Sequence, residues 1–264
     1  MGDALTLPQF PLCRSDYPCY DIRMSLVDRI HQADQVLDQA LSCGLRACAT
    51  TSFQTDGMVL IHLLRRRLPD LPVLFVDTDY HFPEVYAYRD RMASEFGLNI
   101  VNLKAKQTVP EQESQYGVLY NSSPDLCCHM RKVEPLHAGL AEYDMWFSAL
   151  RREQSPSRVN LKVFDNFALH NGKMIRKISP MASWTTRDVW EYLKAFDIPI
   201  LPLYERGYQS IGCQPCTSLP LDADNPRSGR WGGTKLECGI HVPNNYHENV
   251  VNAANSLVQI QAAS

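Results

Sequence analysis

The chain has 264 residues, a length that allows one sizeable α/β domain with a terminal extension or two small domains. Hydrophobic residues make up 45% of the sequence and charged residues 21%, which is typical of a globular protein and excludes a disordered or coiled-coil chain. The net charge of −3 argues against a nucleic-acid partner, because domains that bind nucleic acid usually carry a basic excess.

The sequence also argues against a membrane or exported protein. No apolar run approaches the ~20 residues that cross a bilayer. We interpret residues 1–24 as an N-terminal extension. Its first part, Met1 to Tyr20, lacks the basic start and apolar stretch of a secretory signal. We therefore expect a cytoplasmic protein. In that reducing compartment the nine cysteines indicate metal binding or catalysis rather than disulfides.

Predicted helices and strands alternate along most of the chain. Apolar residues at helical spacing predict the first helix, and the Asn171-Gly172 pair predicts a hairpin turn. The full set comprises helices at 25–41, 57–68, 83–96 and 185–196, strands at 45–51, 72–77, 98–103 and 144–150, and hairpin strands at 164–169 and 174–178. This alternation predicts parallel βαβ units in a doubly wound α/β domain over 25–200. Residues 201–264 would form a loop-rich tail that carries active-site residues.

Polar segments follow three of the predicted strands directly, at 52–57, 77–80 and 151–158. Ligands of open parallel sheets bind beyond the carboxyl ends of the strands, so this convergence predicts a nucleotide site. The first segment opens with Ser52, Phe53 and Gln54, in a strand-to-helix turn whose hydroxyls and backbone N–H groups could meet a phosphate. The turn lacks the Walker lysine and the dinucleotide glycines, so an ordinary polar turn is an equally good interpretation.

The third polar segment is rich in arginine, with Arg151, Arg152 and Arg158 close together. Arginine suits bidentate contacts with phosphate or sulfate, and Ser155 and Ser157 add hydroxyl donors. A solvated run of charges is the alternative. The location at the ligand edge of the sheet favours an anion-binding segment.

Two pairs of cysteines together form a candidate metal site: Cys127, Cys128, Cys213 and Cys216. A C-x-x-C pair is a frequent metal-binding element, and a second pair completes a four-thiolate site. Adjacent cysteines match zinc ribbons poorly, because those use C-x-x-C twice. Thiols packed in a core are the alternative, since free cysteine is commonly buried.

Cys238 lies outside this set, within the segment Glu237-Cys238-Gly239-Ile240-His241, and Arg227, Arg230 and Lys235 precede it closely. Nearby cations depress the pKa of a thiol from ~8.5 into the range ~3.5–7.5, where the thiolate is a major form at neutral pH. The pattern indicates a nucleophilic cysteine. An inert surface cysteine is the alternative.

Together these segments resemble the adenylyl-sulfate (APS) and phosphoadenylyl-sulfate (PAPS) reductase family, most of all its iron–sulfur-containing assimilatory APS reductases. The resemblance runs from about Ala40 to Val242. Its most specific parts are Cys127-Cys128-His129-Met130-Arg131-Lys132-Val133-Glu134-Pro135-Leu136, the Cys213/Cys216 pair, Arg227-Ser228-Gly229-Arg230-Trp231 and Glu237-Cys238-Gly239-Ile240-His241. Two departures are Asp79, where members usually have glycine, and Gly232-Gly233, where many have aromatic residues. The family implies an adenine-nucleotide α-hydrolase-like fold of the PP-loop type.

The resemblance implies thiol-dependent reduction of APS to sulfite and AMP, as in sulfate assimilation and cysteine biosynthesis. Cys238 would attack the sulfur of APS, and thioredoxin or glutaredoxin would release sulfite from the resulting S-sulfocysteine. The family also implies a [4Fe–4S] cluster, whose ligands here would be Cys127, Cys128, Cys213 and Cys216.

We expect further roles for residues around the nucleophile. Lys132 would balance charge during the reaction, and His241 would orient or activate Cys238 unless it is merely structural. Contacts with the substrate are expected from Ser52, Phe53, Gln54, Asp77, Arg158, Arg227 and Arg230. The sequence does not determine the oligomeric state, and a homo-oligomer is one of the states that it allows.

Three alternatives remain at this stage. PAPS reduction uses the same chemistry but needs another cation for the 3′-phosphate, which the sequence does not locate. An ATP-dependent adenylating or RNA-thiolating enzyme would share the fold, yet it would want a Ser-Gly-Gly-type loop that is absent here. A zinc- or cluster-binding interaction protein would be no enzyme at all, and it would not need Cys238.

Overall fold

The computed structural model describes residues 24–223, 225–235 and 237–241. Their strands form one sheet in the order β3-β2-β1-β4-β6-β5. The strand bounds are β1 (Ala47–Thr50), β2 (Pro72–Asp77), β3 (Asn99–Lys104), β4 (Met145–Phe147), β5 (Phe164–Ala168) and β6 (Met174–Ile178). All neighbouring strands pair in parallel except β5, which runs antiparallel to β6 at the edge. The predicted mostly parallel, doubly wound sheet is confirmed.

The helices that flank this sheet are α1 (Leu26–Leu41), α2 (Thr55–Arg65), α3 (Pro83–Phe96), α4 (Val109–Tyr116), α5 (Leu119–Ser122), α6 (Pro124–Cys128), α7 (Glu134–Leu140) and α8 (Thr186–Ala195). Local sequence explains where two of them begin. Ser25 with Asp28, and Thr185 with Asp188, form capping boxes that satisfy backbone N–H groups at the starts of α1 and α8. Both helices therefore begin where the sequence predicts.

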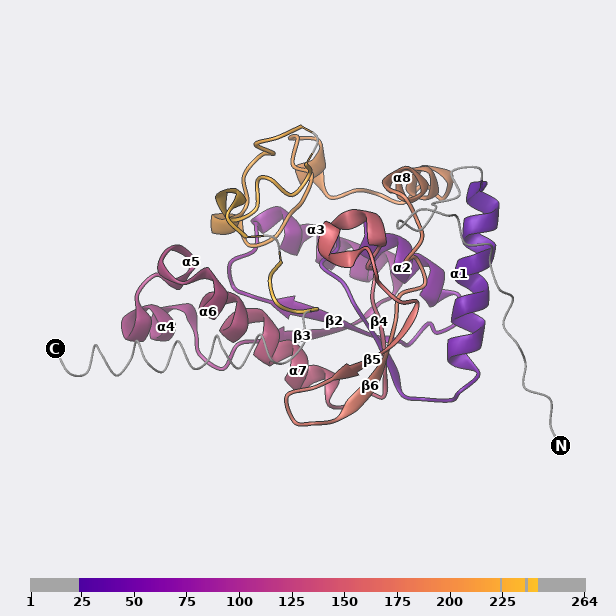
Figure 1. The fold of residues 1–264 in the computed structure, drawn as a ribbon, viewed down its shortest axis with the longest axis horizontal. Coiled ribbons are helices and arrows are strands. Elements are labelled where there is room, and N and C mark those ends of the chain that lie inside the picture. The colour runs from indigo at the N-terminus through magenta and orange to yellow at the C-terminus, as the bar shows by residue number, and fades with distance from the viewer. Residues whose placement is uncertain (1–23, 224, 236, 242–264) are drawn as a thin grey trace.

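Two hydrophobic layers hold the helices to the sheet. The larger one joins α1, α2, α3 and α8 to one face, through residues such as Leu37, Leu60 and Phe75. On the other face, α7 contributes Leu136 and Leu140 to a smaller cluster. Figure 1 shows the same arrangement, with α1, α2 and α8 on one side of the strands and α7 on the other. Both faces of the sheet are covered, as a parallel sheet requires.

Helical turns between β3 and β4 were not part of the predicted set. There α6 passes into a π-helical turn at His129–Val133 and continues as α7. Such turns are rare and occur often at functional sites. This one sets the direction of Lys132 relative to the preceding cysteine pair, and both are buried.

The strand order reverses direction between β1 and β4, because β2 and β3 lie on one side of β1 and the later strands lie on the other. Ligands of open α/β sheets bind at such a switch point, in the crevice beyond the carboxyl ends of the strands. The two loops that leave β1 and β4 here are the polar segments that the sequence singled out. The fold therefore directs both toward one place.

Residues beyond 200 turn back over this sheet edge. Leu201, Leu203 and Ile211 pack into the larger hydrophobic layer, so the loop-rich segment is anchored to the α/β core. The division of the chain at residue 200 stays a prediction, and the proposed extension at 1–24 lies almost wholly outside the described residues.

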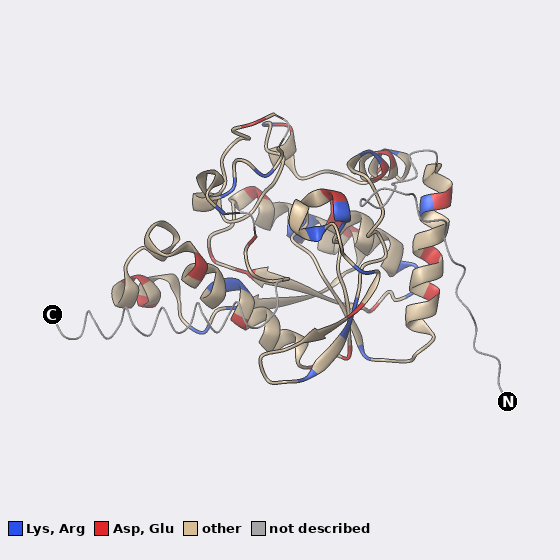
Figure 2. Ribbon diagram, in the orientation of Figure 1, with Lys and Arg blue, Asp and Glu red and all other residues tan. Residues whose placement is uncertain are grey.

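Basic and acidic residues are interspersed over the visible elements (Figure 2). None of the helices in the described ranges has the apolar length that a bilayer crossing requires.

Candidate active site

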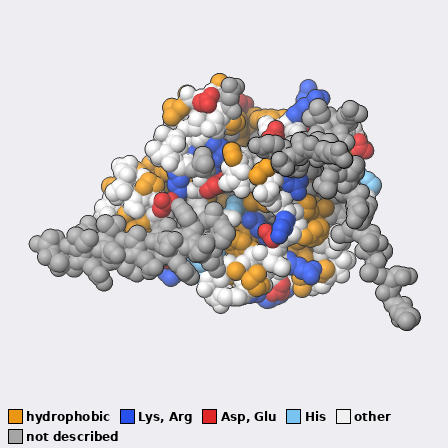
Figure 3. Space-filling view, viewed as in Figure 1, with side chains coloured by type: hydrophobic (Ala, Val, Ile, Leu, Met, Phe, Trp, Pro, Cys, Tyr) orange, Lys and Arg blue, Asp and Glu red, His pale blue; other side chains and the backbone are white. Residues whose placement is uncertain are grey.

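A cavity of about 720 Å³ lies at the switch point. Its walls come from the loops after β1, β2 and β4, from residues 204–212, and from the last described residues up to His241. In the space-filling view, basic and acidic side chains lie side by side between hydrophobic patches near the middle of the visible face (Figure 3). A cavity of this size and mixed character suits a small charged ligand with an apolar part.

The loop after β1 is tightly folded. Ser52 and Gln54 line the cavity, and Gln54 Oε1 accepts a hydrogen bond from the backbone N–H of Ile211 at 3.0 Å. Phe53 differs, because its side chain is fully buried in the hydrophobic core. Gly57 has no side chain where a Cβ would overlap Thr51 Oγ1, so glycine permits the close approach of α2 to this loop. A substrate contact by Phe53 stays a prediction.

Arg151, in the loop after β4, lines the cavity. It is buried and bonded to the carboxylates of Asp56 and Glu153, and it donates to the Trp184 carbonyl oxygen at 3.2 Å. Its charge is therefore balanced within the protein. We conclude that Arg151 joins the loops after β1 and β4 to one another.

Glu237 neutralises two of the predicted anion-binding residues. Its carboxylate accepts from Arg158 Nη2 at 2.8 Å and lies 3.6 Å from Arg227 Nη2. Ser157 Oγ donates to the same carboxylate at 3.0 Å. Burial opposes ionisation of Glu237, but Arg158, Arg227 and Ser157 outweigh it and lower the pKa of this carboxyl. A negative group is thus held where Arg158 and Arg227 would meet an anionic ligand, one residue before Cys238.

Arg230 lies in a cradle that only glycine permits. Its guanidinium covers Gly212, where a Cβ would overlap Nη2, and packs 4.4 Å from the ring centroid of Trp231. Arg230 is 6% exposed, and its buried Nε has no hydrogen-bond partner in the described part of the chain. No carboxylate among the described residues pairs with Arg230. This positive charge is therefore available to a ligand in the cavity.

Lys132 faces sulfur atoms instead of carboxylates. Burial opposes its charge, but the thiols of Cys213, Cys128 and Cys238 outweigh that cost and raise the pKa of the ammonium. Within the described ranges no Asp or Glu forms an ion pair with it. Lys132 therefore stays charged. Its ammonium interacts electrostatically both with the paired cysteines and with Cys238.

Cys238 is half-buried and lines the cavity. Burial alone would raise the pKa of this thiol, and Glu237 acts in the same direction. Lys132, the backbone N–H of Ile240 and Arg230 act oppositely and prevail, so the pKa of Cys238 is lowered. Among the free cysteines of the described residues, burial raises the pKa of Cys48 and of Cys127, Cys128 and Cys216. Cys238 is the thiol with an environment suited to a nucleophile.

His241 also lines the cavity, three residues beyond Cys238. Its ring stacks on Trp146 with centroids 5.2 Å apart, and its Nδ1 lies 3.2 Å from the Nζ of Lys177. Burial and then Lys177 hold the pKa of this imidazole well below its usual value. His241 is therefore neutral at physiological pH.

The four paired cysteines meet at a separate small cavity between α6 and residues 213–216. Cys127, Cys128, Cys213 and Cys216 all line it, together with Tyr80, Tyr120, Pro124, Arg131, Lys132 and Pro215. Burial, followed by the neighbouring thiols, raises the pKa of Cys127 to about 12. The described residues hold no group of three or more ligands arranged around a single metal ion.

This donor set fits a four-iron cluster better than one ion. A [4Fe–4S] cluster takes one thiolate at each iron, so its ligands stand farther apart than those of a single ion. The buried thiols also suppress one another's ionisation, and a bound cationic centre would reverse this. The chemistry of the four donors therefore fits such a cluster.

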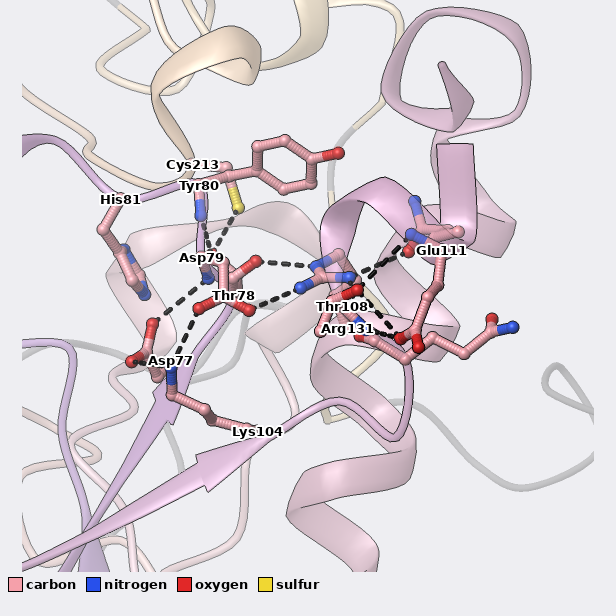
Figure 4. A network of polar contacts seen from close by, with 12 residues as sticks. Asp77, Thr78, Asp79, Tyr80, His81, Lys104, Thr108, Glu111, Arg131 and Cys213 are labelled. Atoms are coloured by element: carbon pink, nitrogen blue, oxygen red, sulfur yellow. Dashed lines mark hydrogen bonds and ion pairs between the residues drawn. The ribbon is translucent and has the colours of Figure 1, made fainter. Parts of the chain in front are cut away.

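Figure 4 shows how the cysteine-bearing helix is joined to the loop after β2. Arg131, which is 1% exposed, donates to the Thr78 carbonyl oxygen at 2.7 Å and to Asp79 Oδ2 at 2.6 Å. Thr78 Oγ1 in turn lies 3.3 Å from Cys213 Sγ. Asp79 has φ +57°, a conformation that favours glycine, and its carboxylate also contacts Lys104 at 3.0 Å. Asp79 thus adopts a backbone conformation that is typical of glycine, and its carboxylate adds ion pairs with Lys104 and Arg131.

Asp77 belongs to the same network and does not line the large cavity. Its Oδ1 accepts from the Tyr86 hydroxyl at 2.7 Å and from the Asp79 N–H at 3.1 Å. Burial opposes ionisation, but these hydrogen bonds and then Lys104 lower the pKa of Asp77. The structure gives Asp77 partners within the protein, and its predicted contact with substrate stays untested.

Several site residues were not singled out by sequence reasoning. Glu237 was quoted in a motif without a role, and Gly212 precedes the C-x-x-C pair without any mark of its own. Lys177 lies in a predicted strand, where a charged side chain is usually solvent-exposed. Their importance follows from distant partners, which the sequence does not reveal.

The fold and cavity define an α/β protein with a ligand-sized cavity at the switch point of its sheet, lined by a thiol whose pKa is lowered. Residues 46–219 match the sequence profile of the phosphoadenosine phosphosulfate reductase domain. The chain is 43% identical over 200 residues to an adenosine 5′-phosphosulfate reductase of Streptomyces coelicolor, covering 75% of this chain and 83% of the relative. It is 41% identical over 194 residues to adenosine 5′-phosphosulfate reductase 1 of Bacillus subtilis, covering 72% and 82%. The chain belongs to the phosphoadenosine phosphosulfate reductase family, as its motifs predicted.

Solved structures agree with this assignment. The phosphate complex of the PAPS reductase from Candida auris superposes with a TM-score of 0.61 at 25% identity, covering 75% of this chain and 99% of that one. The FMN adenylyltransferase of Candida glabrata shares the fold, with a TM-score of 0.58 at 16% identity, over 89% of this chain and 87% of the other. These neighbours confirm the predicted adenine-nucleotide α-hydrolase-like fold.

Replacing Gly212 by alanine tests the cradle of Arg230. The new Cβ would displace the flexible end of the arginine side chain, so we expect kcat/KM to fall by about tenfold while the melting temperature changes little. The control is the same substitution in an Arg230→Ala background, where it should cost almost nothing. Equal losses in both backgrounds would show that Gly212 acts independently of Arg230.

Replacing Lys132 by methionine tests the charge that ionises Cys238. Loss of the cation raises the pKa of the thiol, so the thiolate fraction at pH 7 falls and alkylation slows, by about tenfold for each pKa unit. The measurement is the rate of iodoacetamide labelling at Cys238 between pH 5 and 9, read by peptide mass spectrometry. Lys106→Met is the control, because the Lys106 side chain is 86% exposed and its ion-pair partner is the carboxylate of Glu134. Superimposable rate profiles would contradict the assignment.

Proposed function

We propose that this protein reduces adenylyl sulfate to sulfite and AMP through an S-sulfocysteine on Cys238. The observation that carries this proposal is a single thiol whose pKa is lowered by Lys132 and Arg230 inside a nucleotide-sized cavity. Membership of the reductase family and relatives named adenosine 5′-phosphosulfate reductase support the same reaction. The enzyme would thus act in sulfate assimilation.

The chemistry explains why unpaired cations are needed. APS is a mixed anhydride of sulfate and AMP, and a thiolate must approach a sulfuryl group that is already negative. Two unit charges ~4 Å apart interact by ~4 kcal/mol at an effective dielectric near 20, so one or two fixed cations decide whether the approach succeeds. Among the cations that line the cavity, Lys132 and Arg230 form no ion pair with a described carboxylate. Both lower the pKa of Cys238, so they lie where the thiolate and the anionic sulfuryl group must approach one another.

The bonds and electrons balance with a dithiol partner. Cys238 Sγ bonds to the sulfur of APS while the bond to the AMP oxygen breaks. A partner thiolate then attacks Sγ and sulfite leaves, which reduces the transferred sulfur by two electrons. A second partner thiol completes a disulfide and restores Cys238. Thioredoxin or glutaredoxin is the proposed partner, because each supplies such a pair of thiols.

Arg158 and Arg227 are proposed to contact anionic oxygens of the substrate after Glu237 releases them. Glu237 now accepts a hydrogen bond from Arg158 and forms an ion pair with Arg227, and a phosphate or sulfate group carries the same sign of charge. Ser52 and Gln54 offer polar atoms on the opposite loop. The nucleotide would therefore lie between the loops that follow β1 and β4.

A [4Fe–4S] cluster is the proposed cofactor, held by Cys127, Cys128, Cys213 and Cys216. When bound, it would supply a charged centre beside Lys132 and hold α6 against residues 213–216. The partner thiols supply both electrons of the reaction, so no electron relay is required of it. Lys132 lies on the helical turn that follows the cysteine pair, so fixing the pair also fixes this cation.

APS is favoured over PAPS by the charge pattern. Of the arginines and lysines that line the large cavity, Arg151, Arg158 and Arg227 are bonded to carboxylates, and Lys132 and Arg230 act on Cys238. With Arg158 and Arg227 assigned to the anionic oxygens that APS and PAPS share, no further cation in the described lining remains for a 3′-phosphate. The cytoplasmic location and a homo-oligomeric state stay predictions, and the absence of a nucleic-acid partner stays an expectation from charge.

Replacing Cys238 by serine tests the nucleophile. The parent protein mixed with APS alone should gain the mass of one SO₃ group on the peptide that contains Cys238, and the variant should gain none and lose sulfite release by at least about 10³-fold. Assays with APS and PAPS side by side test the substrate preference. Turnover by Cys238→Ser at the parent's level would refute the proposed reaction.

Replacing Cys213 by serine tests the cluster. Protein purified without oxygen should contain iron and sulfide, and Cys213→Ser should lose most of both, because one of four thiolates is removed. Cys43→Ser is the matched control, since Cys43 is exposed and does not line the small cavity where the four paired cysteines meet. Iron-free parent protein with full activity would overturn the cluster and leave the role of Cys238 intact.

A further inference from the structure

Lys177 on β6 is a buried lysine to which the proposed reaction assigns no role. The residue is 6% exposed, and no carboxylate in the described ranges forms an ion pair with it. A buried ammonium without a paired carboxylate is costly, and an apolar side chain of similar length would pack at least as well. The fold does not explain why a lysine occupies this position.

The surroundings of Lys177 point toward the active site. Its Nζ lies 4.8 Å from the ring centroid of Trp146 and 5.3 Å from that of Phe167, which stabilises the charge by cation–π contact. The Nζ atom of Lys177 also lies 3.2 Å from Nδ1 of His241. The same imidazole stacks on Trp146. Lys177 and Trp146 together hold the imidazole from two sides.

The hydrogen bond determines where His241 carries its proton. An ammonium group has three donors and no acceptor, so Nδ1 of His241 must accept. The proton of the neutral ring then resides on Nε2, which can donate but cannot accept. A second proton on the ring would place two positive charges within 3.2 Å, at atoms already buried together.

We propose that Lys177 is a positioning residue that binds Nδ1 of His241, fixes the Nε2–H tautomer and thereby anchors the segment that carries Cys238. This inference rests on the proposed function, because His241 lines the proposed substrate cavity. The Nε2–H group of its neutral ring would be a hydrogen-bond donor there. It also makes His241 unable to accept a proton from Cys238. Ionisation of that thiol is left to Lys132 and Arg230.

The charge of Lys177 is itself sensitive to pH. Burial and then Arg158 lower its pKa, Asp165 and Glu237 oppose them, and the pKa is about 8. Trp146, Phe167 and His241 are the other groups packed against the ammonium. Above that pH the amine gains a lone pair and no longer requires Nδ1 to accept. The preference for the Nε2–H tautomer should therefore weaken as the pH rises through 8.

Nitrogen NMR of the protein labelled with ¹⁵N-histidine tests the tautomer directly. The signals of His241 are identified by their loss in His241→Gln. In the parent protein at pH 7 we expect a protonated Nε2 and an unprotonated Nδ1. In Lys177→Met the two tautomers should mix and the pKa of His241 should rise, whereas Lys177→Arg should keep the parent pattern. A protonated Nδ1 in the parent, or unchanged signals in Lys177→Met, would overturn the proposal.

Steady-state kinetics separate positioning from a purely structural role. In Lys177→Met we expect KM for APS to rise about tenfold, with the melting temperature no lower than that of the parent and rescue by Lys177→Arg. Lys194→Met, an exposed substitution on α8, is the control and should match the parent. A lower melting temperature with unchanged KM would mean that Lys177 only supports the fold. If the parent failed to turn over APS but showed the expected tautomer, the proposed function alone would fail.

Discussion

The buried ammonium of Lys132 is the charge on which the arrangement of this site depends. It faces Cys128 and Cys213 of the paired thiols as well as Cys238, and these sulfurs keep it protonated despite burial. Because Lys132 follows the cysteine pair on one helical turn, its position and that of the pair are mechanically linked. A charge placed this way can ionise a thiol without a carboxylate partner that would cancel it.

Carboxylates within the protein neutralise three other cations of the cavity, Arg151, Arg158 and Arg227. Arg151 is satisfied by Asp56 and Glu153 and holds two loops together. Arg158 and Arg227 share Glu237, which is adjacent to the nucleophile. Binding of an anionic group by these two arginines would therefore compete with the contacts of the segment that bears Cys238. In the proposed reaction, recognition of the substrate and placement of Cys238 would thus be coupled through one carboxylate.

Local sequence predicted the elements whose signals are short-range. Thr185 with Asp188 marks the start of α8, and the buried run of β2 matches its predicted bounds. The helical turns over 109–140 were missed, because their short amphipathic stretches give little periodicity and the π-helical turn at His129–Val133 has no sequence signature. Their positions depend on packing against the sheet and on the Arg131 contacts with Thr78 and Asp79.

The sequence by itself determined the chemistry that this protein carries: paired cysteines, a separate cysteine among cations, and polar loops after parallel strands. Those signals are residue types at fixed spacing, which survive without knowledge of the fold. Only the tertiary structure decided which charges cancel, since Glu237 pairs with Arg158 across 79 residues and Lys177 meets His241 across 64. The energy of an electrostatic interaction depends on the distance between the charges in space, and the separation of two residues along the chain does not reveal that distance.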